Sequence, residues 1–186
     1  MFRHFMFDSE KALQAVAFLL RHERGHRMNY MRLLKLLYLA DRESLAESGK
    51  PIAGGRVVAM QRGPVLEDVF SIIRDKHPET AKWSAFIQRD HYHLEMISDP
   101  GVGRLSRYAR DKLSEIAQRF ENQDEWDMVE MSHQLPEWAK NNPGTSSKEI
   151  PLRDILDAVG RLADLDEIVQ SASMDEAAAP TMKSAL

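Results

Sequence analysis

One arrangement of residues near the start of the chain is typical of metal-dependent peptide hydrolysis. His22, Glu23 and His26 have the H-E-x-x-H spacing, in which two imidazoles hold zinc from one helical turn while the glutamate activates a bound water. The surroundings favour another interpretation, because Gly25 falls inside the motif where the helix is expected to end. We therefore expect a solvated helix end, where cationic side chains suit the helix dipole. A zinc hydrolase remains the alternative.

A second set of metal-ligand types alternates along a predicted strand. His91, His93 and Glu95 would share one face of that strand, but the solvent-facing side of a hairpin gives the same pattern. The sequence contains no cysteine, no nucleophile elbow, no phosphate loop and no dinucleotide-binding fingerprint. We therefore predict a protein that is not an enzyme, with no catalytic residue, no bound metal and no cofactor.

A single carboxylate lies in the middle of an apolar helix face. On a helical wheel Asp41 is surrounded by Leu34, Tyr38 and Leu45, and a buried carboxylate needs hydrogen-bonding partners. We predict that these partners are backbone N–H groups at a helix start over residues 63–66, or the guanidinium groups of two nearby arginines, Arg56 and Arg62. Asp41 would then fix the fold. The alternative is a functional acid with a shifted pKa at a partner site.

The elements that position these residues are mostly helical. Asp8 and Asn29 are predicted helix caps, and Arg32, Lys35, Arg42 and Glu43 are expected to form the narrow wet stripe of an otherwise buried second helix. Helices are predicted over residues 9–24, 30–48, 64–75, 106–120 and 124–132 and from residue 151 onward, and strands over residues 56–61, 85–88 and 91–97. The predicted class is mainly α with a small antiparallel β element (α+β), in a single compact helical domain.

Length and charge restrict the functional classes further. The 186 residues suffice for one domain, which we predict over residues 1–173, followed by a flexible tail over residues 174–186. From residue 151 onward there are three basic and seven acidic side chains, which account for the whole net charge of −4. A neutral body with an acidic arm makes nucleic-acid binding unlikely. The lack of cysteine fits a reducing cytoplasm, and no apolar run is long enough for a membrane span.

Three segments together carry a family resemblance. The chain resembles the Panacea family of SocA-like antitoxins in residues 33–42 (LLKLLYLADR), 49–52 (GKPI) and 59–65 (AMQRGPV). The later residues Ser132-His133 and Pro136-Glu137-Trp138 resemble the C-terminal motif of the family. The resemblance covers about residues 9–138. The motif positions are Lys35, Tyr38, Asp41, Gly49, Pro51, Gly63, Pro64 and Trp138.

The resemblance implies a helical domain with an antitoxin role. Members neutralise unrelated bacterial and phage toxins by direct contact, and some present the toxin to an ATP-dependent Clp protease. The implied partners are therefore a cognate toxin and, for an adaptor, a Clp unfoldase. The predicted partner-binding residues are Arg56, Gln61, Arg62 and Trp126. A DNA-binding regulator of its own operon is a further alternative. Trp138 and Tyr108 could also anchor a partner, although large aromatics belong to the core more often.

Overall fold

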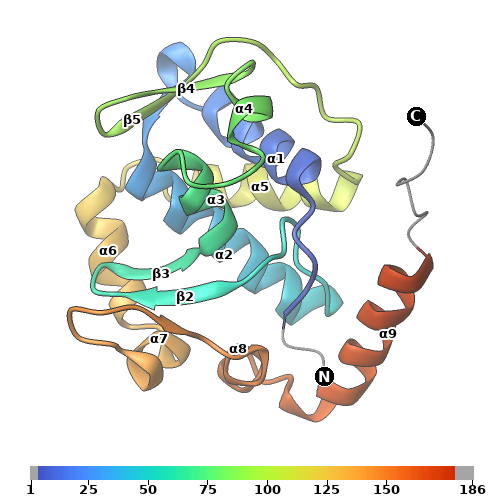
Figure 1. Cartoon of the computed structure of the whole chain (residues 1–186). Coiled ribbons are helices and arrows are strands. Elements are labelled where there is room, and N and C mark those ends of the chain that lie inside the picture. Colours follow the sequence, from blue (N-terminus) through green and yellow to red (C-terminus); the bar gives the residue numbers. More distant parts are fainter. Residues whose placement is uncertain (1–3, 179–186) are drawn as a thin grey trace.

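A computed structural model describes residues 4–178, and a long central helix, α2 (Tyr30–Ser48), organises them (Figure 1). The helix begins and ends where the sequence predicts. The Asn29 side chain accepts a hydrogen bond from the Met31 N–H at 2.8 Å, and Gly49 ends the helix in the left-handed conformation at φ 74°. The predicted wet stripe is wrong in part, because Arg32 and Lys35 are buried.

Three further helices pack against or beside α2. They are α1 (Ser9–Arg21), α5 (Arg107–Arg119) and α6 (Glu125–His133). Each has a side-chain N-cap, from Asp8, Ser106 and Asp124 respectively, that accepts backbone N–H groups of the first turn. Leucines from α1 and α2, together with Leu113 and Ile116 of α5, form the fully buried centre of the main core.

Two small antiparallel sheets complete the body within the described residues. In one sheet the order is β1 (Arg27–Asn29), β5 (His93–Met96) and β4 (Ile87–Asp90), and in the other it is β3 (Gly63–Leu66), β2 (Val57–Met60) and β6 (Lys148–Glu149). The predicted α+β class is therefore confirmed. The predicted hairpin near residue 90 also forms, but it turns at residues 91–92, two residues later than expected, with His91 at φ 53°.

The prediction of a helix beginning at Pro64 is wrong. Residues 63–66 are strand β3, paired with β2 from Met60↔Gly63 to Val57↔Leu66, and helix α3 (Glu67–Ile73) begins only afterwards. Pro64 lies on β3, which is an edge strand of its sheet. Proline is tolerated there, because its missing N–H removes no hydrogen bond from the interior of the sheet. The pairing of two short apolar strands therefore decides the local structure.

The remaining elements are short until the last helix. They are α4 (Thr80–Trp83), α7 (Pro136–Asn141), α8 (Leu152–Ala158) and α9 (Leu165–Ala178), with single 3₁₀ turns at Arg24–His26 and Leu162–Asp164. Gly160, at φ 74°, separates α8 from α9. Figure 1 shows α9 at the side of the molecule, near the N-terminal segment. It extends through Ala178, so the first five residues of the predicted tail are helical; the others lie outside the described residues.

The C-terminal segment has its own small core. Leu152, Ile155, Leu156 and Ile168 pack with Trp138 and with side chains of α2 and β2. Strand β6 extends the second sheet next to β2, with Val58 opposite Glu149. None of the helices described over residues 4–178 has the length and apolar character needed to cross a membrane.

Candidate functional site

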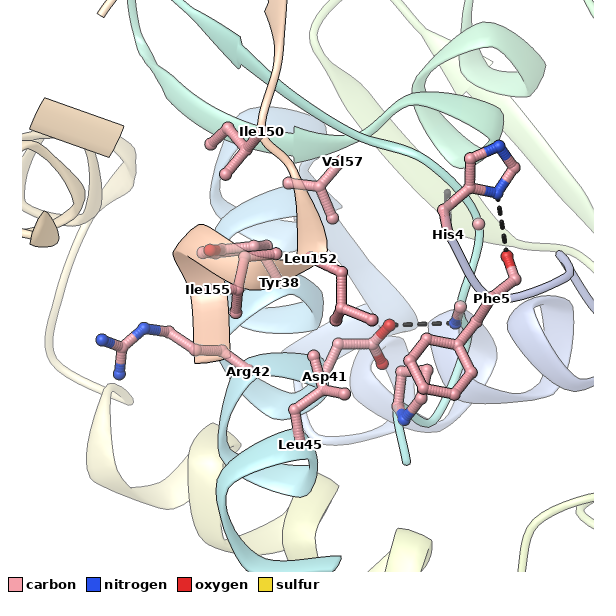
Figure 2. A pocket seen from close by; sticks show the side chains of 13 residues that line it. His4, Phe5, Tyr38, Asp41, Arg42, Leu45, Val57, Ile150, Leu152 and Ile155 are labelled. Carbon is pink, nitrogen blue, oxygen red and sulfur yellow. Dashed lines mark hydrogen bonds between the residues drawn. The ribbon is translucent and has the colours of Figure 1, made fainter. Parts of the chain in front are cut away.

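Asp41 is buried, as predicted, but its partners differ from those predicted. The side chain is 3% exposed, and its carboxylate accepts backbone N–H bonds from Ile52 (2.9 Å), Ala53 (2.8 Å) and Gly54 (2.9 Å). Figure 2 shows this carboxylate pointing from α2 to the turn. Burial raises the pKa of Asp41 to about 6, an effect that outweighs the opposing effect of the three N–H donors. The predicted partners of Asp41, which were residues 63–66 and the guanidinium groups of Arg56 and Arg62, are not among its hydrogen-bond donors.

The turn over residues 49–55 has a shape that depends on glycine. Gly54 lies at φ 70°, and a Cβ atom there would be 2.6 Å from the backbone oxygen of Met6. The N-terminal segment therefore crosses directly over the turn that holds Asp41. The cavity beside Asp41, shown in Figure 2, has a volume of about 30 Å³, which is room for a single water. This site holds the fold together and has no space for a substrate.

A second buried acid, Glu137, joins α7 to α2. Its carboxylate is fully buried and accepts a hydrogen bond from the Tyr38 hydroxyl at 2.8 Å. It also forms an ion pair with the Arg42 guanidinium at 2.6 Å. Burial and the neighbouring carboxylate raise the pKa of Tyr38 well above its usual value. We had not predicted this role for Glu137. The available signal was a tyrosine in the core stripe of α2, whose buried hydroxyl needs an acceptor.

Trp138 and Gly63 connect the same elements at close range. The Trp138 indole N–H donates to the Met60 oxygen at 2.9 Å, and its ring stacks on His133 with 4.1 Å between centroids. Gly63 has φ 96°, and a Cβ atom there would lie 2.2 Å from the Ser132 hydroxyl. Only glycine fits at this crossing of β3 with α6.

Lys35 is a buried cation of a different kind. Its side chain is 2% exposed, and its ammonium donates to the Pro64 oxygen at 2.8 Å. Within the described part of the chain, no carboxylate lies close enough to form an ion pair with it. Burial lowers the pKa of Lys35 to about 7.

A cleft of about 310 Å³ lies where α2 meets the β2–β3 hairpin. Gln61 and Arg62 line this cleft, and the Arg62 guanidinium lies 5.1 Å from the centroid of the Trp126 ring, which is 53% exposed. Three of the four predicted partner-binding residues are thus close together. The fourth, Arg56, lies at the other end of β2 and pairs with Glu67. The cleft residues are Tyr30, Met31, Leu34, Lys35, Met60, Gln61, Arg62, Gly63, Val65, Phe70, Thr145 and Ser146.

The family model for the SocA-like antitoxin, Panacea domain, matches residues 33–139. This chain belongs to the SocA-like antitoxin family with the Panacea domain. All eight motif positions predicted from the sequence lie inside the matched stretch. No curated protein and no solved structure matches the chain.

The H-E-x-x-H residues, which precede the matched Panacea domain, are not arranged as a zinc site. His22 follows the last residue of α1, and Glu23 pairs with Arg32 at 2.5 Å. Helix α1 ends at Arg21, and Gly25 has φ 72° in the 3₁₀ turn that follows, so the two histidines do not share an α-helical turn. His91 lies in a turn, so it leaves the strand that carries His93 and Glu95. Across residues 4–178, no group of three or more histidine, aspartate or glutamate side chains could hold a metal ion.

Proposed function

We propose that this chain is an antitoxin that neutralises a cognate toxin by direct protein–protein contact. The observation that carries the proposal is the match of the Panacea domain over more than half of the chain, residues 33–139. The geometry is compatible with a binding protein, because the buried acids serve the fold. Asp41 is held by three N–H groups, and Glu137 by Tyr38 and Arg42. The proposal assigns no reaction to the chain.

The surface that we propose for toxin contact is the cleft and its aromatic rim, here called the Arg62–Trp126 surface. It consists of the cleft residues together with Trp126 and Tyr92. Tyr92 is strongly exposed, and its ring lies 6.4 Å from the ring of Tyr30. Tryptophan, tyrosine and arginine dominate the binding energy of protein interfaces. Exposed rings around a hollow are therefore suited to anchoring a partner.

The proposal is tested by co-expression with the product of the neighbouring gene. We expect that the wild-type chain restores growth against a toxic neighbour and forms a stable complex with it. Trp126→Ala and Arg62→Ala should each weaken the complex by tenfold or more, as expected for hot-spot residues. Tyr108→Ala is the matched control, because this partly exposed tyrosine contacts Glu47 near the opposite end of α2. The proposal is wrong if no complex forms with the wild-type chain and growth is not restored.

Delivery of the toxin to a Clp protease is a second way in which the chain could neutralise the toxin. We propose that the protein acts in the cytoplasm. Delivery requires a second surface for the unfoldase. We propose α9 for that surface, because it lies outside the matched stretch and at the side of the body (Figure 1). The half-life of the toxin in cells with and without the Clp protease distinguishes the two routes. A toxin that stays long-lived while the antitoxin is present would exclude delivery.

A further inference from the structure

The two buried lysines among residues 4–178 have opposite surroundings. Lys112 is 5% exposed, and its ammonium contacts three carboxylates, those of Glu43 (3.1 Å), Glu47 (2.7 Å) and Glu115 (2.9 Å). Lys35 is even less exposed, and among the described residues it has a single acceptor, the neutral oxygen of Pro64. A buried ammonium carries three donors and a full charge, so it is costly unless an anion lies beside it. Lys35 therefore has donors to spare, and an anion placed beside it would stabilise its charged form.

Lys35 lines the cleft of the Arg62–Trp126 surface, where no anion compensates it. Of the described residues lining the cleft, Lys35 and Arg62 are the charged ones, and none is acidic. Tyr30 is the other titratable group. On the adjoining α6, the His133 ring stacks on Trp138 and contacts the Gln61 oxygen. The other lining residues are mostly apolar, so the cleft combines an apolar wall with positive charge.

We propose that this cleft receives an acidic side chain of the toxin, flanked by apolar residues, whose carboxylate pairs with the ammonium of Lys35. This inference rests on the proposed function and names the chemistry of its contact. The carboxylate supplies the missing anion, while Lys35 can keep its bond to the Pro64 oxygen. The apolar wall excludes water around the pair, which makes the pairing selective for an acidic residue in a defined position.

The charge distribution favours a protein carboxylate over a nucleic-acid phosphate. A phosphate backbone is bound by extended arrays of lysine and arginine. Here two cations stand in a largely apolar hollow, and the whole chain has a net charge of −4. A pair of cations among apolar side chains fits a single acidic residue within an apolar protein segment better than it fits a phosphate backbone.

The first experiment measures affinity and stability together in two matched variants. We expect that Lys35→Met weakens binding to the product of the neighbouring gene at least tenfold, while the midpoint of urea unfolding stays the same or rises. Lys112→Met should leave the affinity unchanged and lower the midpoint of urea unfolding, because it leaves three carboxylates without their shared cation. Wild-type affinity in Lys35→Met would overturn the inference. So would a loss of stability in Lys35→Met as large as that in Lys112→Met, since it would assign Lys35 to the fold alone.

The second experiment does not depend on the toxin. Sodium propionate, a carboxylate with a short apolar chain, is titrated into the wild-type protein while NMR follows the methylene signals next to the lysine ammonium groups. The Lys35 signals are identified by their absence in Lys35→Met. We expect propionate to shift the Lys35 signals and leave those of Lys112 unchanged. If the neighbouring protein does not bind, the proposed function fails, and this titration decides the inference: unmoved Lys35 signals at hundreds of millimolar propionate would overturn it.

Discussion

Replacing Asp41 by asparagine tests how the turn over residues 49–55 is held. Asparagine has nearly the same shape and keeps the oxygen that accepts the Ile52 and Ala53 N–H groups. Its amide NH₂ replaces the oxygen that accepts the Gly54 N–H, so two donors face each other. One buried N–H loses its acceptor, and we expect Asp41→Asn to lower the free energy of unfolding by about 1–3 kcal/mol at pH 7.

The same variant isolates the pH dependence contributed by Asp41. The pKa of Asp41 is about 6 in the folded protein, against an ordinary value of 3.8. Between these values the folded state holds a proton that the unfolded state has released. Asp41 therefore adds stability as the pH falls from about 6 to about 4, up to about 3 kcal/mol in total, and adds no further change outside that window. Asparagine does not titrate, so it lacks this contribution.

Urea unfolding of both proteins at pH 7.0, which is above this window, and at pH 6.0, 5.0 and 4.5, which are within it, measures the difference directly. Other carboxylates titrate alike in both proteins and cancel in the difference. We expect the stability advantage of the wild type over Asp41→Asn to grow as the pH falls. A difference that stays constant would refute a raised pKa. A difference that shrinks would mean that the three N–H donors outweigh burial and lower the pKa instead.

Three further substitutions test the contacts around α2 by urea unfolding. Tyr38→Phe removes one donor from the buried Glu137 carboxylate and should cost about 1–3 kcal/mol; an unchanged midpoint would contradict that hydrogen bond. Gly63→Ala should cost about 2–4 kcal/mol, because φ is 96° and the new Cβ would meet the Ser132 hydroxyl. Ser132→Ala in that background should recover only the part of the loss that comes from the clash with the Ser132 hydroxyl, because the Lys35 side chain also lies close to the new Cβ. Trp138→Phe keeps an aromatic ring but loses the N–H bond to β2, and should cost about 1–3 kcal/mol.

The local features of this fold could be predicted from the sequence. The caps of α2, at Asn29 and Gly49, depend on residues next to the helix ends, and so do the caps of α1 and α5. The burial of Asp41 follows from helical periodicity, because its neighbours on the wheel are apolar. The resemblance of the three motif segments also indicated the family that the domain match shows.

The β2–β3 hairpin is where prediction failed, and the error spread to the partners of Asp41. Gly63 and Pro64 before an apolar run predict a helix start, because proline suits the first helical position. The competing signal was present: two apolar runs, residues 57–60 and 63–66, are separated by two polar residues, Gln61 and Arg62. That spacing is typical of a tight hairpin. Because residues 63–66 do not start a helix, the N–H donors to Asp41 come from the turn that follows α2.

Among the charged residues that α2 buries or half-buries, a comparison of Asp41, Arg42 and Lys35 shows which of these three is available for binding. Asp41 has three N–H donors, and Arg42 has the Glu137 carboxylate, so both have used their capacity inside the fold. A partner could engage either residue only by breaking those bonds, which would cost about as much as the new contact contributes. Lys35 has a neutral acceptor and lines an open cleft. An anion brought by a partner would therefore add its interaction with Lys35 almost in full, and this makes Lys35 the charge on α2 whose retention costs stability and serves binding.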